Sequence, residues 1–497
     1  MVVHGFAREN RMSQIEIGRR AFLAVAAGLA GAARLGAQQG NFTLPPGPSG
    51  PIGIKADRPT LLMGDEAKIA GALQPGMVGN TCKRLQVRNW NTADDSFTWQ
   101  VDAPAGGEFD VTALIKSKGA VLEFTCDGKK TERPVSTAWD RIDLGPLKLT
   151  KGLHEISLRA PQPAPNMEFY SLELIRPDLD RKMQKQVKDM RSDTSWMRKA
   201  KYGLQFHWTS MSAPRQGERK NYLEATRDFP AKEFAAMVNA TGAGYVIITT
   251  SHAQHYFPAP IQAIDRIKPG RTAERDLVRD WIEALGAYNI KLILYYHMGH
   301  DDWRQPDGWW RATGYDPKNP QKFLANWTAI TTEVGQRYGK GLAGWFFDDG
   351  CAYYPLNPDF RSLTAAAKTG NPNRVVCYNP WVLPRMTDFQ DYLCGEGYEF
   401  LKFRDGLPAD GTGIYTSGPH KGLQAHTNFI LEGDWPHSRL NTPIRPPRYP
   451  KDQFIADMKG GIAHGVVPSV NLEIYQDGGI GEASAALMAV LGQEIEG

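Results

Sequence analysis

The sequence predicts a multi-domain protein with an N-terminal all-β sandwich followed by a (β/α)8 barrel of the TIM type. Three observations support this prediction. The chain has 497 residues, too many for one ordinary domain. Short alternating runs between turn residues fill residues 56–178. From residue 201 to 497, strand-like runs alternate with amphipathic helical runs, which is the pattern of a parallel sheet covered by helices.

Residues 1–37 predict an export signal. Arg19 and Arg20 precede an apolar segment of about a dozen residues, and small residues follow at Gly36 and Ala37. The apolar segment is too short to span a bilayer. Paired arginines before Phe22 resemble a twin-arginine signal. We therefore expect a bacterial periplasmic or secreted protein whose mature chain begins near Gln38.

Residues 38–55 are rich in Gly, Pro and Gln and predict an extended linker. The sandwich that follows resembles carbohydrate-binding jelly rolls, on the runs "LGPLKLTKGLHEISL" and "FYSLELI". A sugar-binding role and a purely structural role both remain open. Solvent exposure of the sandwich tryptophans would favour sugar binding; these are Trp90, Trp99 and Trp139.

Composition limits the classes of function that remain possible for this chain. The net charge of +4 is small and no basic tract is present, so nothing indicates nucleic-acid binding. No segment after the signal is long and apolar enough to span a membrane. Cys82 and Cys126 could pair in an oxidising compartment. The other cysteines are interpreted as small apolar residues; they are Cys351, Cys377 and Cys394.

A polar helical connector is expected over residues 179–200, and eight strand-like runs follow it. Eight runs favour a closed barrel over an open sheet, and no GxGxxG or GxxxxGK[ST] follows a strand. Functional side chains of such barrels lie at the C-terminal strand ends. Here those ends carry His207; His252 and His255; Tyr296, His297, His300 and Asp301; Asp348 and Asp349; Asn379; Glu396 and Glu399; Glu432, Asp434 and Trp435; and Asn471 and Glu473.

Two chemistries fit a mouth lined by carboxylates and histidines. A metal could be held by His297, His300 and Asp301, but no HExxH or similarly tight spacing is present. Alternatively, two carboxylates could flank a glycosidic bond while histidines and aromatic rings hold the sugar. Export, aromatic richness and the appended sandwich favour the second chemistry, with a carbohydrate substrate and without a metal or other cofactor.

Six segments of the barrel follow one another in a fixed order: "YGLQFHW", "TTSHAQHYF", "KLILYYH", "WFFDDG", "NPWVLPRMTDFQDYLCGE" and "VPSVNLEIYQDGGI". On these segments the barrel resembles the retaining α-L-fucosidases of glycoside hydrolase family 29. The family's "FGIFIHWG" compares with "YGLQFHW", "TTKHHDGF" with "TTSHAQHYF", and "KFGLYYS" with "KLILYYH". The nucleophile strand, "WFDG" or "WNDMG", compares with "WFFDDG", and "NR…GDYxTPE" with "NPWVLPRMTDFQDYLCGE". The late "NLLLNIGPxxDGxI" compares with "VPSVNLEIYQDGGI". Order and spacing hold over about 290 residues.

The resemblance implies a double displacement in which an aspartate attacks and a glutamate serves as acid/base. The nucleophile so implied is Asp348, which matches the "WNDMG" aspartate, whereas the "WFDG" form would instead favour Asp349. Glu396 matches the "TPE" glutamate, and Glu399 is the alternative acid/base. If Asp348 points into the mouth, strand alternation directs Asp349 elsewhere, into a hydrogen bond or ion pair. The substrate-binding residues so implied are His207, His252, His255, Tyr296, Phe346, Asp349, Arg385, Glu399 and Trp435.

Several positions depart from the family pattern. Ala253 replaces the second of the paired histidines, although His255 could fill the same space, and Phe346 replaces the usual Trp. These changes fall around the sugar, so they bear on its identity rather than on the reaction. The sequence thus predicts an exported retaining exo-glycosidase for terminal α-L-fucosyl residues or a closely related sugar. The alternatives are a glycosidase of different specificity and a catalytically impaired carbohydrate-binding protein; no motif assigns an oligomeric state.

Overall fold

The computed structural model describes residues 50–75, 86–135, 139–252, 254–297, 308–316, 318–380 and 383–496. The predicted export signal, most of the linker, Cys82, Ala253, His300 and Asp301 lie outside the described residues. None of the helices in the described ranges combines the length and apolarity needed to cross a membrane.

The described N-terminal residues form two six-stranded sheets that are antiparallel except for the β1–β6 pair. One sheet has the order β1-β6-β11-β8-β9, with β3 beside β6. The other has the order β10-β7-β12-β5-β4, with β2 beside β12. The strands are β1 (Ile52–Gly53), β2 (Thr60–Met63), β3 (Lys68–Ala70), β4 (Gln74–Pro75), β5 (Val87–Trp90), β6 (Ser96–Ala103), β7 (Gly107–Lys116), β8 (Val121–Cys126), β9 (Lys129–Pro134), β10 (Trp139–Leu149), β11 (Gly152–Gln162) and β12 (Met167–Ile175).

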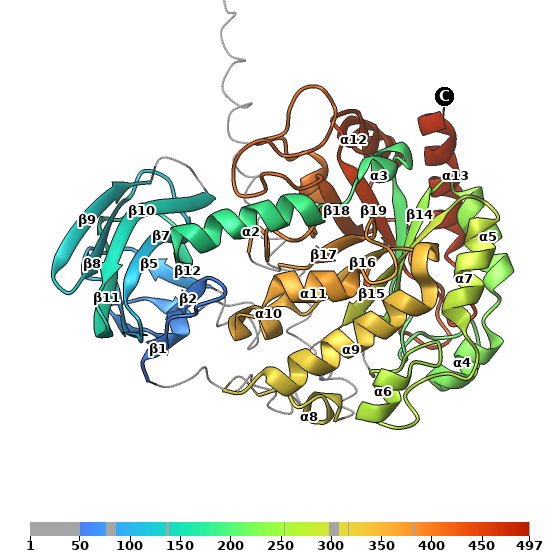
Figure 1. Cartoon of the computed structure of the whole chain (residues 1–497). Helices are drawn as coiled ribbons and strands as arrows, with labels where there is room; N and C mark the ends of the chain where they lie inside the picture. Colours follow the sequence, from blue (N-terminus) through green and yellow to red (C-terminus); the bar gives the residue numbers. More distant parts are fainter. Residues whose placement is uncertain are drawn as a thin grey trace, which may run out of the picture. The chain divides into compact units, whose positions relative to one another are not determined.

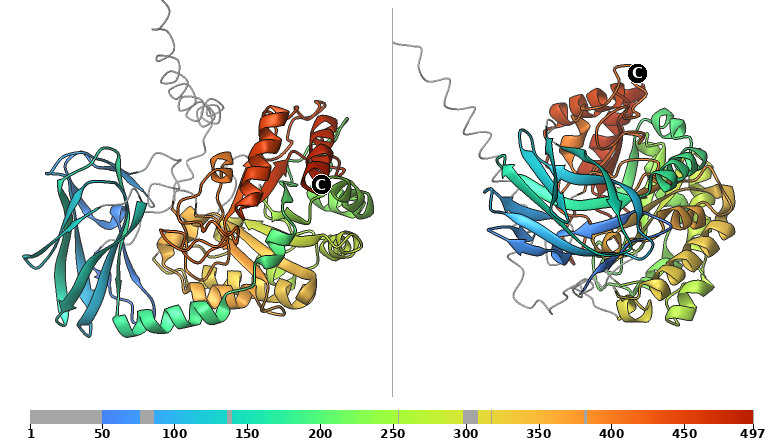
Figure 2. Two further views of the ribbon diagram at one scale, coloured as in Figure 1. Left: turned by 90° about the horizontal axis from the view of Figure 1, so that it is seen from above. Right: turned by 60° about the vertical axis from the view of Figure 1, so that its left-hand side comes forward.

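The two sheets lie against each other (Figure 2). Side chains from both sheets form one hydrophobic core. Alternate residues of β6 turn inward, as the period of two requires, and place Phe97 and Trp99 in this core. Trp90 packs edge-on to Phe97 with ring centroids 5.3 Å apart. Trp90 and Trp99 are both 0% exposed, so neither offers a surface to a sugar ring. The side chain of Trp139 lies outside the described part of the structure.

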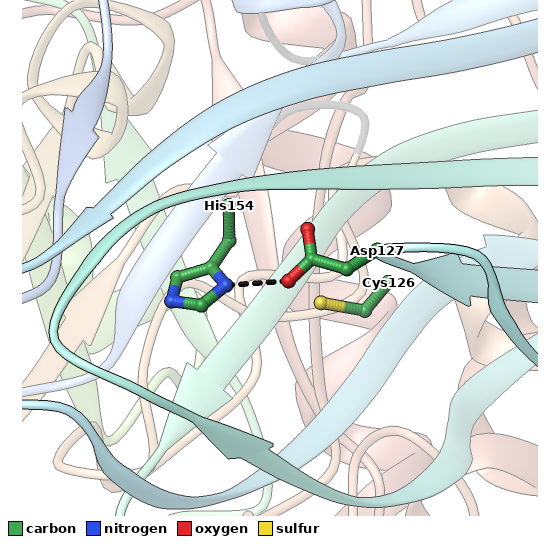
Figure 3. A group of neighbouring side chains, drawn as sticks. All are labelled: Cys126, Asp127 and His154. Carbon is green, nitrogen blue, oxygen red and sulfur yellow. Dashed lines mark hydrogen bonds and ion pairs between the residues drawn. The ribbon is translucent and has the colours of Figure 1, made fainter.

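A group of three side chains joins β8 to β11 in the N-terminal sheets (Figure 3). Ligand atoms of Cys126, Asp127 and His154 lie within 4.8 Å of one another. Both ring nitrogens of His154 are already engaged, Nδ1 by Asp127 at 2.6 Å and Nε2 by the Thr150 carbonyl at 2.9 Å. The hydrogen bond from Asp127 raises the pKa of His154. A metal needs a free imidazole lone pair, so this group is a structural link between strands.

Helices α2 (Pro177–Met190) and α3 (Ser195–Lys199) lead to a third sheet, which is entirely parallel. Within the described residues it has seven strands in the order β17-β16-β15-β14-β13-β19-β18. The strands are β13 (Gly203–Phe206), β14 (Tyr245–Ser251), β15 (Lys291–His297), β16 (Leu342–Asp348), β17 (Val375–Tyr378), β18 (His426–Ile430) and β19 (Val467–Leu472). Because β13 pairs with β19, this order follows the chain around a ring, as in a TIM-like barrel.

The predicted sixth strand, "DYLCGEG", is an irregular segment instead of a regular strand. It nevertheless occupies the position between β17 and β18. The Asp391 amide donates to the Val376 carbonyl at 2.7 Å, and the Gly397 amide donates to the Asn428 carbonyl at 2.9 Å. Gly395 and Gly397 have φ values of 60° and 144°, which interrupt a regular ladder. The Glu396 carboxyl is thus delivered from a bent segment.

Helices cover the outside of this parallel sheet, with α5, α7, α9 and α11 visible around its strands (Figure 1). Their apolar sides face the strands; in α7 the buried residues are Leu277, Val278, Trp281 and Leu285. The helices are α4 (Tyr222–Asp228), α5 (Ala231–Ala240), α6 (Gln262–Ile267), α7 (Leu277–Gly286), α8 (Trp309–Ala312), α9 (Gln321–Tyr338), α10 (Gly350–Tyr353), α11 (Phe360–Ala367), α12 (Lys451–Ala463) and α13 (Glu482–Glu496), with 3-10 turns η1 (Gly64–Glu66), η3 (Gly339–Gly341), η4 (Tyr354–Leu356) and η5 (Tyr398–Leu401).

Candidate active site

Two carboxylates meet at the C-terminal ends of neighbouring barrel elements. Asp348 is the last residue of β16, and Glu396 lies in the irregular segment beyond β17. Asn379, just after β17, donates from Nδ2 to Asp348 Oδ1 at 2.9 Å and to Glu396 Oε2 at 3.0 Å. These two oxygens cannot be farther apart than the sum of the two distances, 5.9 Å. The planar geometry of an amide NH2 group places them about 5 Å apart.

The two acids of this pair have different surroundings. The Glu396 side chain reaches solvent along the wall of a cavity, but protein encloses it on the other sides. Desolvation, followed by the negative charge of Asp348, raises the pKa of Glu396 to about 7. The hydrogen bond from Asn379 acts in the opposite direction, and the nearby charge of Glu399 adds to the rise. A carboxyl group with this pKa can exchange a proton near neutral pH, which is what general acid/base catalysis requires.

Tyr295 is the second donor to Asp348, and its hydroxyl bonds to Oδ2. Burial, and then the charge of Asp348, raise the pKa of Tyr295 well above its usual value, so the hydroxyl remains a donor. The sequence motif had predicted Tyr296 as the tyrosine at the mouth of the barrel. That choice is wrong in orientation, because alternation along β15 turns Tyr296 outward into the core beneath the helices. Apolar residues occupy both faces of β15, with Ile293 and Tyr295 on one face and Leu294 and Tyr296 on the other. The sequence pattern therefore does not show which tyrosine points into the barrel.

Phe346 also has a different place from the one expected. It is 1% exposed and lies in the barrel interior, where it stacks on Tyr295 with ring centroids 5.4 Å apart. It therefore supports the tyrosine that bonds Asp348 and does not reach the mouth itself.

Asp349 is held apart from Asp348, in the way strand alternation predicts. It is 0% exposed, and its Oδ1 pairs with His297 Nε2 at 2.9 Å. The backbone turns sharply here, with Asp349 at φ 70°. The next residue must be glycine, since a Cβ at Gly350 would lie 2.2 Å from the Asn379 carbonyl oxygen. Of the two adjacent acids, Asp348 is the one that remains accessible.

Aromatic and imidazole rings gather beside Asp348. The His207 ring centroid lies 5.0 Å from that of Tyr295, 4.9 Å from that of Trp435 and 5.6 Å from that of His252. His207 Nδ1 bonds Asn471 Oδ1 at 2.7 Å, and Asn471 donates in turn to the Trp435 carbonyl at 3.0 Å. Residues just after β13 and β14, on β15 and in the loop after β18 thus form one wall. The structure brings the predicted His207, His252 and Trp435 together.

His255 is more deeply buried than His207 and His252. It is 2% exposed and stacks on Trp309 at 5.3 Å, with the His297 ring 5.6 Å away. His300 and Asp301, two members of the metal set considered above, lie outside the described residues. Among the residues that are described, these histidines do not form a group with metal-binding spacing.

The loop that carries Trp435 is anchored by Glu473. One carboxylate oxygen accepts from the amides of Gly433 and Asp434 at 3.2 and 3.1 Å, and the other pairs with His437 Nδ1 at 3.0 Å. Glu473 is 1% exposed and lies one residue beyond β19. The strand-end pattern singled out Glu473, but only the structure shows that it holds the loop.

Arg385 and Glu399 have separate environments. Arg385 pairs with Asp388 at 2.6 Å and donates to the Lys421 carbonyl at 2.9 Å, so the structure does not bring it to either central carboxylate. Glu399 is the second residue of the turn η5, and its carboxylate folds over Gly397, where a Cβ would lie only 2.4 Å from Oε1. Glu399 therefore acts on Glu396 through its charge.

Comparison with known proteins places this geometry in a family context. Residues 220–402 match the family model described as alpha-L-fucosidase, and this segment contains Asp348, Asn379 and Glu396. No curated protein matches the sequence significantly.

Similar solved structures are distant. A family 29 α-L-fucosidase from Bacteroides thetaiotaomicron is 15% identical, with 62% of this chain and 74% of that one covered and a TM-score of 0.44. The Thermotoga maritima α-fucosidase is 18% identical, with the same coverages and a TM-score of 0.41. An endo-fucoidan hydrolase of glycoside hydrolase family 107 is 13% identical, with 59% and 52% covered and a TM-score of 0.44. The family match over residues 220–402 confirms the resemblance to the α-L-fucosidases seen in the motifs and supports a glycoside hydrolase.

Proposed function

We propose that this protein is an exported retaining exo-glycosidase that hydrolyses terminal α-L-fucosyl residues or a closely related sugar. The observation that carries the proposal is the single Asn379 amide that reaches both carboxylates, at 2.9 and 3.0 Å. Retaining glycosidases need carboxyl groups about 5–5.5 Å apart, whereas inverting enzymes leave about 6.5–9.5 Å for a water molecule. The spacing set by Asn379 supports the retaining arrangement.

In the first step, one oxygen of Asp348 attacks the anomeric carbon while the bond to the glycosidic oxygen breaks. That oxygen keeps the electron pair and takes the proton of Glu396, so the leaving group departs as an alcohol. Water then attacks the anomeric carbon of the glycosyl ester, gives a proton to Glu396 and releases the sugar with its configuration retained. A pKa of about 7 suits Glu396 for both proton transfers.

The wall beside Asp348 suits a monosaccharide. Trp435 offers a partly exposed aromatic ring next to His207, and His252 is accessible on the same side. Aromatic faces bind the C–H faces of sugars, and imidazoles bond to hydroxyls. The family match supports fucose as the sugar. Export rests on the twin-arginine-like sequence at Arg19 and Arg20.

A panel of 4-nitrophenyl glycosides that includes the α-L-fucoside tests the proposal. We expect release from the α-L-fucoside, and NMR of the first product should show the α anomer. An Asp348→Gly variant should lose at least about a thousandfold in kcat and regain turnover when azide is added. Asp349→Gly with the same azide treatment is the matched comparison, since azide should not restore its turnover.

Three results would count against the proposal. Release of the β anomer first would exclude retention. Azide rescue of the Asp349 variant alone would move the nucleophile by one residue. Release from another glycoside in place of the fucoside would keep the reaction and change the sugar.

A further inference from the structure

The loop that follows β18 is basic and carries Trp435. Its residues 433–450 include three arginines and one acid, Asp434, whose carboxylate accepts from the Trp435 amide at 2.8 Å. Trp435 packs beside His207, with ring centroids 4.9 Å apart, in the wall next to Asp348. A positive charge on this loop therefore lies close to the place proposed for the sugar ring.

Arg445 lies across the backbone of this loop, two residues before Trp435. A Cβ at Gly433 would lie 2.6 Å from Arg445 Nη1 and 2.8 Å from its Cδ, so the glycine makes room for the arginine. Arg445 is exposed, and its side chain forms neither a hydrogen bond nor an ion pair with any residue that the structure describes. The donors of its guanidinium fork are therefore available to an anion beside the wall.

A second guanidinium without an acidic partner lies in the loop after β13. Arg219 donates to the Ser438 carbonyl at 3.0 Å, which joins its loop to the loop of Trp435. Its neighbours Arg215 and Lys220 each pair with an aspartate, at 2.9 and 2.7 Å, whereas no described acid pairs with Arg219. Arg219 is partly buried, and desolvation lowers its pKa with no described carboxylate opposing the effect. Burial of such a charge costs free energy unless an anion pairs with it.

Arg439, on the same loop as Trp435, shares its acidic partner with other groups. Its Nη2 lies 3.7 Å from Glu473 Oε2, and His437 Nδ1 lies 3.0 Å from the same oxygen. The other oxygen of Glu473 accepts from two backbone amides of the loop. Glu473 is therefore engaged by its own neighbours and leaves the two unpaired arginines uncompensated.

The anions that saccharides carry fit guanidinium groups well. Sulfate esters and uronic carboxylates both present several oxygens to paired N–H donors, and both are negatively charged at neutral pH. A neutral glycan offers only hydroxyl groups, so it would leave the two positive charges unpaired. The arrangement therefore favours a substrate with an acidic group.

We propose that the substrate is an anionic saccharide and that Arg445 and Arg219 bind a sulfate ester or a carboxylate on it. The assignment rests on the proposed function, because it places the acidic group on the glycoside whose fucosyl bond is cleaved beside Asp348. Trp435 binds the sugar ring and the two arginines bind its charged substituent. Because the charges meet at a partly exposed site, added salt weakens the interaction.

Fucosides with and without an acidic group test the assignment. With the 2-, 3- and 4-O-sulfates of 4-nitrophenyl α-L-fucoside, we expect kcat/KM for at least one to exceed that of the unsulfated compound about tenfold or more. An α-L-fucosyl-galacturonic acid disaccharide, compared with α-L-fucosyl-galactose, tests the carboxylate in the same way. The pair of substrates that shows the preference identifies the anion. The preference should decrease when NaCl is raised from about 20 mM to about 500 mM.

Substitution of Arg445 by glutamine removes the charge and keeps a polar side chain. The ratio of kcat/KM for the preferred anionic substrate to that for its neutral counterpart should fall about tenfold in Arg445→Gln and about threefold or more in Arg219→Gln. Arg448→Gln is the matched control, because it removes an equal charge from the same loop. The guanidinium of Arg448 is instead engaged by Tyr449, 2.7 Å from its hydroxyl and 5.0 Å from its ring centroid. The control should keep the parent's ratio.

The outcomes separate this assignment from the proposed function. A parent that hydrolyses the neutral fucoside but prefers none of the anionic substrates would overturn the assignment and leave the proposed function standing. An unchanged ratio in Arg445→Gln, or an equal fall in Arg445→Gln and Arg448→Gln, would overturn it as well, because neither result needs a binding site at Arg445. Failure on every fucoside, neutral and anionic, would refute the proposed function itself.

Discussion

Replacement of Glu396 by glutamine should stabilise the protein in mildly alkaline solution while it removes the acid/base. The folded state raises the pKa of Glu396 from 4.5 to about 7. A carboxyl group with a raised pKa contributes its full stability below the unfolded pKa, and that stability is lost as the pH rises through the folded pKa. Glutamine resembles the protonated carboxyl and does not titrate, so the variant avoids this loss.

The size of the effect follows from the same pKa values. If the whole pKa shift of Glu396 were expressed in stability, the parent would lose roughly 3 kcal/mol of unfolding free energy at pH 8. Because the Glu396 side chain reaches solvent, screening reduces this to about 1 kcal/mol. At pH 5 most of the difference is absent, since the folded carboxyl is still protonated. We expect the Glu396→Gln variant to melt about 2 °C above the parent at pH 8 and close to it at pH 5.

Thermal unfolding followed by circular dichroism at both pH values measures this difference. A Glu274→Gln variant, in an exposed loop before α7, controls for the loss of one negative charge. The Glu396 variant should also lose the alkaline limb of the kcat/KM profile, which in the parent should fall about tenfold per pH unit above pH 7. A variant that melts at the parent's temperature at pH 8, in a parent without an alkaline limb near pH 7, would show that Glu396 does not titrate there.

Two further substitutions test the supports of the site. Tyr295→Phe removes one hydrogen-bond donor from Asp348 and should lower kcat/KM by about 10–100-fold. Tyr296→Phe, in the outer core, should keep kcat/KM within about threefold of the parent. Equal effects of the two substitutions would contradict the assignment of Tyr295 as the donor to Asp348. Glu473→Gln weakens the hydrogen bonds and the ion pair that hold the loop of Trp435. KM should therefore rise about tenfold, with kcat within about threefold of the parent. An unchanged KM would exclude a positioning role for Glu473.

The two candidate acids could be singled out from local sequence patterns. Asp348 follows a strand-end motif, Glu396 follows a family motif, and the family match covers both. The choice between Tyr295 and Tyr296 could not be made in the same way. Both residues can face either side of a sheet that is buried on both sides. Strand alternation therefore places the two tyrosines on opposite faces but does not say which one points into the barrel.

Arg385 shows a second limit. It follows the expected motif order, but its guanidinium pairs with Asp388 three residues later, and a local partner of this kind removes it from the mouth. Trp90 and Trp99 show a third, because an aromatic residue in an alternating strand has the same pattern whether its face is covered by a second sheet or by a sugar.

The sequence by itself determined the alternation of strands and helices, the position of the acids at strand ends and the kind of chemistry they can perform, because these depend on residues close together in the chain. Only the tertiary structure decided that Asn379 holds both carboxylates and that desolvation raises the pKa of Glu396 to about 7. These properties arise from distances between groups on different barrel elements and from desolvation by the protein around them, which no local pattern specifies.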